Sequence, residues 1–175
     1  AMVIAVSEAG GLGSLPCAIL DVAKARAEIG VIRQQTAKPV NVNFFCHEPA
    51  APDQDRDTAW KKHLAAYYEE LGLDAFVSAP AVNRAPFDEA MCEIVEDTKP
   101  EVVSFHFGLP AKPLLERVKA ADSRVLSSAT TVEEARWLED NGCDAIIAQG
   151  YEAGGHRGMF LTDDIAMQAG TFALV

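Results

Sequence analysis

Short apolar runs that alternate with helical segments constrain the fold of this 175-residue chain more than any other feature. The runs have the length of strands, and segments with apolar residues at helical spacing separate them. Such alternation predicts a parallel sheet with right-handed crossovers, and therefore an α/β fold. We predict strands at residues 12–15, 39–45, 102–107, 124–128 and 145–149, with 75–78 as a sixth candidate.

The helical segments carry their own start and stop signals. Pro86 and Pro113 each suit the first turn of a helix, where a missing N–H costs nothing. Thr131 and Glu134 have the spacing of a capping box. Another segment carries an amphipathic stripe, which we interpret as core-facing, and Gly72 fits the C-terminal cap of that single helix. The stripe consists of Trp60, Leu64, Tyr67, Tyr68 and Leu71.

Composition excludes several classes of function. The formal charge is −11, from 15 basic and 26 acidic residues, which argues against a nucleic acid or an anionic membrane surface as a partner. No apolar run approaches the roughly 20 residues of a membrane span. The cysteines have neither CxxC nor metal-ligand spacing, so we expect reduced thiols, a cytoplasmic location and no metal site. They are Cys17, Cys46, Cys92 and Cys143.

A glycine-rich loop that holds one histidine follows the last predicted strand. The apolar run 143–147 indicates a buried strand, and residues 148–158, AQGYEAGGHRG, come next. Glycines let the backbone approach a flat or anionic ligand, and a histidine can move a proton near neutral pH. The loop therefore suits a phosphate-bearing cofactor beside a carbon acid. The alternative is a glycine-rich turn in which His156 is merely exposed.

Polar side chains occur at the carboxyl ends of several predicted strands, which meet at the edge where α/β folds place their sites. Asn43 offers a donor and an acceptor to a planar ring, or else is a turn residue. His106 either lines a substrate pocket or is a satisfied core histidine. Alternation lets only one of Ser127 and Ser128 face the site, and we choose Ser128. Gln149 is either a buried hydrogen-bonded group or a cofactor ligand.

Four stretches in order form a recognisable set. They are SEAGGLGS at 7–14, NVNFFCH at 41–47, VSFHFG at 103–108 and the loop at 148–158. Together they resemble the nitronate monooxygenases, formerly called 2-nitropropane dioxygenases, which are FMN-dependent (β/α)8 barrels. Related enoyl-reductases carry a similar Glu-Ala-Gly-Gly-His loop, and the stretch around His106 favours the nitronate enzymes.

The resemblance implies a flavin site. In the family, the residues that match Asn43, Gln149 and Gly154 contact FMN, and we add Gly155 and Ser128 as further expected cofactor contacts.

The positions of two histidines at strand ends predict their roles, with His156 as the catalytic residue and His106 in the substrate pocket. A neutral imidazole at 156 could take the α-proton of a nitroalkane, and a protonated one could stabilise a bound nitronate. The implied activity is FMN-dependent oxidation of alkyl nitronates by O2 to a carbonyl compound and nitrite. The alternatives are an FMN-dependent NAD(P)H reductase and a non-catalytic fragment that binds no flavin.

The length of the chain bears on the fold. A closed barrel of this kind needs about 250 residues, and this chain begins and stops within helical segments. We therefore expect residues 1–175 to form a single incomplete TIM-type (β/α)8 barrel domain with five or six parallel strands, and weak FMN binding by this piece alone. Open strand edges would favour association into a homo-oligomer. A smaller complete α/β domain with an open sheet is the alternative.

Overall fold

The computed structural model describes residues 1–74, 77 and 85–175. It contains two compact units, one of Ala1–Glu48 with Asn83–Val175 and the other of Pro49–Val82. The first unit holds the sheet, and the second holds two short helices. The interpretation of residues 1–175 as one domain stays a prediction.

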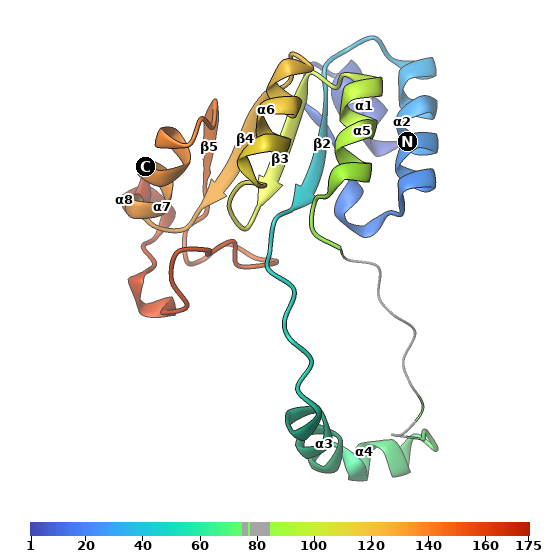
Figure 1. The fold of residues 1–175 in the computed structure, drawn as a ribbon, viewed down its shortest axis with the longest axis vertical. Helices are drawn as coiled ribbons and strands as arrows, with labels where there is room; N and C mark the ends of the chain where they lie inside the picture. The colour runs from blue at the N-terminus through green and yellow to red at the C-terminus, as the bar shows by residue number, and fades with distance from the viewer. Residues whose placement is uncertain (75–76, 78–84) are drawn as a thin grey trace. The chain divides into compact units, whose positions relative to one another are not determined.

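Five parallel strands in the described part of the chain form one sheet, ordered as in the sequence (Figure 1). The register places Asn43 opposite Ser104 and Phe105 opposite Ser127. The predicted parallel α/β architecture is confirmed. The candidate strand at 75–78 lies outside the described residues except for Val77. The strands are β1 (Gly13–Pro16), β2 (Val40–Phe45), β3 (Val102–His106), β4 (Arg124–Ala129) and β5 (Ala145–Ala148).

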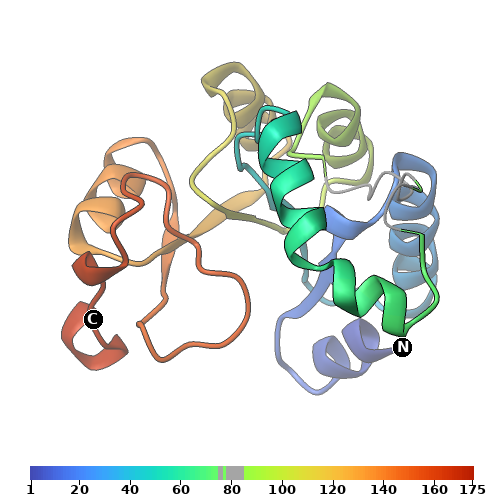
Figure 2. The same ribbon diagram turned by 90° about the horizontal axis from the view of Figure 1, so that it is seen from below.

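The helices of the first unit precede the first strand, connect consecutive strands or follow the last strand. They are α1 (Met2–Glu8), η1 (Cys17–Ile19), α2 (Val22–Gln35), α5 (Glu89–Thr98), α6 (Lys112–Ala120), α7 (Val132–Asp140), η2 (Ile165–Met167) and α8 (Thr171–Leu174). Helices α2, α5, α6 and α7 lie along one face of the sheet (Figures 1 and 2). A doubly wound sheet would reverse its strand order and carry helices on both faces. The arrangement is that of a TIM-barrel segment, as predicted.

Alternation along the strands sends apolar side chains to the helix-covered face. In β2, Val40, Val42 and Phe44 are buried in the core, whereas Asn41 and Asn43 point to the opposite face, which we call the inner face. The helices complete the core with Ala25, Ile29, Ile32, Cys92, Ile94, Val95, Leu115 and Val118.

Helix α5 begins later than predicted. Its N-cap is Asp88, whose carboxylate accepts a 2.9 Å hydrogen bond from a backbone N–H of the first turn. Pro86 precedes the helix, and the N–H of Phe87 donates to the carbonyl of Phe45 at 2.7 Å. The placement of Pro86 in the first turn is wrong, because the aspartate cap is the stronger start signal. Pro113 does lie in the first turn of α6, as predicted.

Strand β5 is exposed, although its apolar run predicts burial. Ile146 and Ile147 are 38% and 45% exposed. Among the described strands β5 pairs only with β4, so it lies at an edge of the sheet. The prediction of a buried strand is wrong, because an apolar run does not show whether a strand has a second neighbour.

The second unit contains two helices, α3 (Gln54–His63) and α4 (Ala65–Glu70), where the stripe predicts one. The break falls at Leu64, whose φ of −89° and ψ of 1° leave the α-helical region. Neither helix buries a side chain, and Trp60 is 61% exposed. The stripe is therefore not buried within its own unit, and its core-facing interpretation stays a prediction. Gly72, with φ +65°, is the predicted cap.

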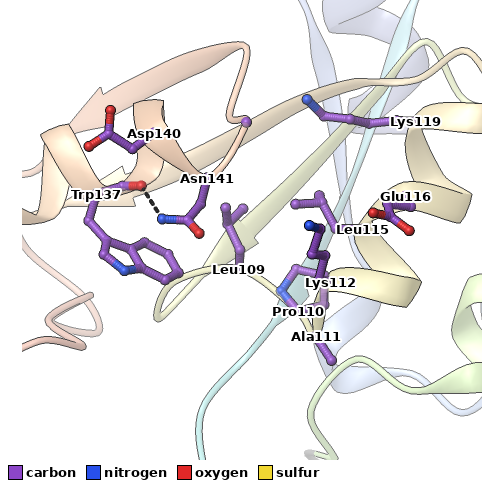
Figure 3. A pocket seen from close by; sticks show the side chains of 11 residues that line it. Leu109, Pro110, Ala111, Lys112, Leu115, Glu116, Lys119, Trp137, Asp140 and Asn141 are labelled. Carbon is purple, nitrogen blue, oxygen red and sulfur yellow. Dashed lines mark hydrogen bonds between the residues drawn. The ribbon is translucent and has the colours of Figure 1, made fainter.

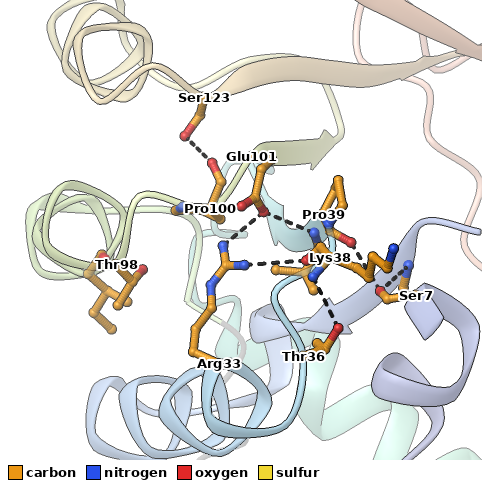
Figure 4. A network of polar contacts seen from close by, with 12 residues as sticks. Ser7, Arg33, Thr36, Lys38, Pro39, Thr98, Pro100, Glu101 and Ser123 are labelled. Carbon is orange, nitrogen blue, oxygen red and sulfur yellow. Dashed lines mark hydrogen bonds and ion pairs between the residues drawn. The ribbon is translucent and has the colours of Figure 1, made fainter. Parts of the chain in front are cut away.

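A polar network closes the amino-terminal end of the sheet (Figure 4). The carboxylate of Glu101 accepts from Arg33 Nη2 at 2.8 Å and from the N–H of Val40 at 3.0 Å. The hydroxyl of Ser123 donates to the carbonyl of Pro100 at 2.6 Å. These bonds tie α2 to the starts of β2, β3 and β4. Polar groups at this end therefore satisfy one another and stabilise the fold.

Candidate active site

The inner face of the sheet carries a row of polar side chains. Asn43 Nδ2 donates to Ser104 Oγ at 2.9 Å. Asn41 Nδ2 lies 2.8 Å from both Ser104 Oγ and Ser14 Oγ. Asn41 Oδ1 is buried and has no hydrogen-bond partner among the described residues, which is unusual for a buried polar atom.

Alternation separates the two serines at the end of β4. Ser127 faces the helices, and its hydroxyl donates to the carbonyl of Gly108 at 2.8 Å. Ser128 faces the inner face, where its Oγ lies 3.0 Å from His106 Nδ1. The structure therefore places Ser128, and not Ser127, on the face that carries Asn43.

His106 ends β3 with both ring nitrogens hydrogen-bonded. Its Nε2 lies 3.1 Å from the carbonyl oxygen of His156, and its Nδ1 contacts Ser128. Burial lowers the pKa of His106; the hydrogen bond to the His156 backbone opposes this, and the charge on His156 adds to the lowering. The neutral ring is therefore favoured at neutral pH. The hydrogen bonds to both ring nitrogens agree with the interpretation of His106 as a satisfied histidine. Contact between His106 and a substrate stays a prediction.

Gln149 clamps the glycine-rich loop with its side-chain amide. Its Nε2 donates to the carbonyl of His156 at 2.8 Å, and its Oε1 accepts from the N–H of Gly158 at 2.7 Å. One N–H and one lone pair of the amide remain for another partner. A flavin contact by Gln149 is therefore compatible with the clamp.

The loop glycines have different roles. A Cβ at Gly158 would lie 2.6 Å from His106 Cε1, so no larger residue fits there. Gly155 has φ +79°, a conformation that favours glycine. At Gly154 and Gly155 a Cβ would meet open space. Gly158 is therefore needed for packing, whereas the other two leave the backbone accessible to a ligand.

His156 combines a fixed backbone with an unclaimed side chain. Its carbonyl accepts from both His106 and Gln149. Its exposed ring has no hydrogen-bond partner among the described residues. The ring centroid lies 5.5 Å from that of Phe45 and 6.3 Å from that of Phe107. Two aromatic rings thus flank an imidazole whose nitrogens are free to bind another molecule.

Arg157 supports the loop from within. Its guanidinium donates to the carbonyls of Gly150 and Tyr151 at 3.0 and 2.8 Å. In the structure it holds the start of the loop.

Glu134 is a residue that the sequence analysis assigned to a different role. Its buried carboxylate accepts from the N–H and the hydroxyl of Thr130 and from the N–H groups of Phe160 and Leu161, at 2.7–3.2 Å. In a capping box it would instead bond the N–H of Thr131. Only the threonine half of that prediction is confirmed. Glu134 thus anchors the segment after the loop, and its spacing to Thr131 concealed this long-range contact.

One cavity lies away from these side chains (Figure 3). It measures about 590 Å³ and is lined by residues of α6 and α7, among them Lys112, Leu115, Lys119 and Trp137. None of the predicted site residues lines it. We place the site by the convergence of polar groups at the strand ends, where parallel α/β folds bind their ligands.

A cavity of about 390 Å³ lies beside the ends of β2 and β3. Its lining includes Cys46, His47, Phe107 and Met159. The Nδ1 of His47 is buried without a hydrogen-bond partner among the described residues. His47 follows β2 in a loop.

The cysteines show no sign of nucleophilic use. All four are free thiols. Burial raises the pKa of Cys17 to about 12 and also raises that of Cys46, so both stay protonated at neutral pH. Within the described ranges, no group of three or more His, Cys, Asp and Glu side chains could hold a metal ion. Every helix in those ranges is too short or too polar to span a membrane.

The loop and the inner face fit the flavin that the resemblance implies. The backbone N–H groups of residues 154–157 donate no hydrogen bond to the described residues. Successive free N–H groups suit an anionic or carbonyl oxygen. Asn43 Oδ1 accepts no hydrogen bond within the described part of the chain, so it can receive one from a ring N–H. These donors and acceptors converge at one edge of the sheet.

Comparisons with known proteins agree with this geometry. A family model described as nitronate monooxygenase matches residues 1–175. Proteins named nitronate monooxygenase from Paraburkholderia phytofirmans and Pseudomonas aeruginosa are 42% and 41% identical to this chain. Those alignments cover 99% and 100% of this chain, and 48% and 50% of the relatives. The chain thus spans about half the length of the curated relatives it matches.

Solved structures give the same picture. A nitroalkane oxidase from Streptomyces ansochromogenes superposes with a TM-score of 0.85 at 34% identity, over 99% of this chain and 49% of that one. FabK from Thermotoga maritima superposes with a TM-score of 0.63 at 25% identity, over 99% and 40%. The family match extends over the whole chain, so this chain belongs to the nitronate monooxygenase family, a family of oxidoreductases.

Proposed function

We propose that the protein oxidises alkyl nitronates with FMN and O2 to a carbonyl compound and nitrite. The observation that carries this proposal is the state of His156. Two donors hold its backbone carbonyl, while its imidazole has no partner in the described part of the chain. A catalytic acid or base needs this combination of a fixed position and free ring nitrogens.

His156 can serve two forms of substrate. A neutral imidazole accepts the α-proton of a nitroalkane and so forms the nitronate. The resulting imidazolium lies beside the nitronate oxygens and stabilises their negative charge. The rings of Phe45 and Phe107 form an apolar wall beside this imidazole.

The cofactor contacts that we propose are Asn43, Ser128, Gln149, Gly154 and Gly155. When bound, FMN would supply the electron acceptor for the nitronate, with O2 as the final oxidant. Asn43 and Gln149 would orient the polar edge of the ring through their remaining donors and acceptors. The glycines would let the loop backbone approach the ring closely.

The protein is further proposed to act in the cytoplasm. Its four cysteines are all free thiols, as expected in a reducing compartment.

The test is an assay of the intact purified protein. Flavin absorbance after dialysis would show whether the protein retains FMN. Oxygen uptake with nitrite release from a preformed nitronate is the expected result. Consumption of NAD(P)H without nitrite would instead support the reductase alternative. A colourless protein without activity would support the non-catalytic one.

A further inference from the structure

We propose that His106 is a positioning residue, which holds the backbone of His156 through one tautomer that Ser128 selects. The inference rests on the proposed function, since it assigns His156 its place in that reaction. His106 would then act through the loop rather than by contact with the substrate.

The hydrogen bonds define the tautomer. The carbonyl oxygen of His156 can only accept, so the hydrogen must be on Nε2 of His106, 3.1 Å away. A neutral imidazole has one donor and one acceptor, which leaves Nδ1 as the acceptor. The hydroxyl of Ser128, 3.0 Å from Nδ1, must therefore donate. Ser128, His106 and His156 thus form a chain of two hydrogen bonds, in which Ser128 donates to His106 and His106 donates to the carbonyl of His156.

Packing keeps the His106 ring in this orientation. Its centroid lies 4.4 Å from that of Phe107 and 5.9 Å from that of Phe45. On another side, a Cβ at Gly158 would lie 2.6 Å from His106 Cε1, so the loop backbone approaches the ring closely. Burial favours the neutral form that the tautomer requires. The ring thus has little room to rotate or shift.

The position of the clamp explains its effect on catalysis. His106 Nε2 and Gln149 Nε2 donate to the same carbonyl, that of His156. The imidazole of His156 is attached to this clamped backbone and makes no hydrogen bond of its own within the described part of the chain. Movement of this backbone would therefore move the imidazole. Because proton transfer depends steeply on geometry, a small shift would lower the rate.

Imidazole nitrogen NMR of the intact protein tests the tautomer without any assay. We expect His106 to show a protonated Nε2 and a bare Nδ1 above neutral pH. Ser128→Ala should produce a mixture of tautomers, because it removes the donor to Nδ1. Ser127→Ala is the matched control, since it deletes the neighbouring hydroxyl from the opposite face. An Nδ1–H tautomer in the parent, or equal effects of the two serine variants, would overturn the proposal.

Two substitutions of His106 test the clamp. His106→Gln keeps a donor near the position of Nε2, whereas His106→Asn is too short to reach the loop. His106→Asn removes one of the two hydrogen bonds to the carbonyl of His156 and so loosens the loop. The amide of Gly158, which donates to Gln149 in the same loop, should then exchange with solvent roughly fivefold to tenfold faster. His106→Gln should exchange close to the parent rate. Unchanged exchange in His106→Asn would contradict the clamp.

Kinetics separate this inference from the proposed function. In His106→Asn, turnover of a neutral nitroalkane should fall about tenfold to 100-fold, with flavin retained and preformed nitronate affected less. His106→Gln should recover most of the lost rate. If the parent protein oxidises no nitronate, the proposed function fails, while tautomer and amide exchange still decide the role of His106. Equal losses in both variants would identify His106 as a direct contact instead.

Discussion

The two ends of the sheet differ in whether their polar groups are hydrogen-bonded to one another. At the amino-terminal end, Glu101, Arg33 and the N–H of Val40 satisfy one another (Figure 4). At the carboxyl-terminal end, the ring of His156 and the N–H groups of residues 154–157 have no partners in the described part of the chain.

This difference indicates which end of the sheet stabilises the fold and which end can bind and react with a ligand. Polar groups that pair with one another stabilise the chain and leave nothing for a ligand. Polar groups that stay free at the strand ends are available to bind and react, as in TIM-barrel enzymes generally. Substitutions at one end should therefore change the free energy of unfolding, and those at the other end should change chemistry.

The largest expected effect is that of His156→Ala. Turnover of neutral nitroalkanes should fall by roughly 10²–10⁴-fold, because a general base is lost. Preformed nitronates need no deprotonation and should be affected less, chiefly in kcat/KM if the imidazole binds the anion. Oxygen uptake with both substrate forms, after flavin loading is confirmed, is the measurement.

His63→Ala is the matched control, because His63 is exposed and lies outside the strand ends. Unchanged rates in His156→Ala with both substrate forms would remove His156 from the mechanism.

Glu134→Gln tests an exception to this contrast, because the Glu134 carboxylate is fully hydrogen-bonded although it lies at the carboxyl-terminal end. An amide would turn a donor toward the N–H groups that the carboxylate now accepts. We expect a loss of about 1.5–3 kcal/mol in the free energy of unfolding. Denaturant titration measures it. Glu133→Gln, at an exposed neighbour, should have little effect, and equal losses would show that the buried bonds contribute nothing.

Asn43→Ala should weaken flavin binding more than it changes the fold. It removes a donor and an acceptor from a buried ring edge, at about 1–3 kcal/mol per unsatisfied group. Fluorescence titration of the apoprotein with FMN gives the change in affinity. Asn141→Ala serves as a control, because that side chain only bonds the carbonyl of Trp137. Retention of FMN as tight as in the parent would exclude Asn43 from the cofactor site.

The fold was largely predictable because local signals agree with it. The apolar runs located all five described strands, and Pro113, Thr131 and Gly72 each marked a helix end. The errors concern partners that local sequence does not encode. Periodicity could not show that Ile147 lies on an edge strand, nor that nothing in its unit buries Trp60.

For the candidate site, the sequence predicted a set of positions at the strand ends but not the hydrogen bonds among them. Strand ends and the resemblance both indicated Asn43, His106 and His156. The sequence could not show that Gln149 bonds the loop backbone, since that contact depends on how residues 150–158 fold back. Glu134 was hidden for the same reason, because its partners lie 26 and 27 residues further along the chain.

The smallest expected effect concerns Glu101→Gln at the amino-terminal end. Burial alone would raise the pKa of Glu101, but the hydrogen bonds from Arg33 and from the N–H of Val40 outweigh it and lower the pKa. A lowered folded pKa contributes stability above the unfolded value of about 4.3, and this contribution is lost as pH falls through the folded value. Because the ion pair is partly exposed, we expect at most about 1 kcal/mol at pH 7. Denaturant unfolding of parent and variant should therefore differ at pH 7 and converge toward pH 3, whereas Glu28→Gln, at an exposed glutamate, should match the parent throughout. A difference that persists at pH 3 would mean that the Glu101 carboxylate does not stabilise this end by its charge.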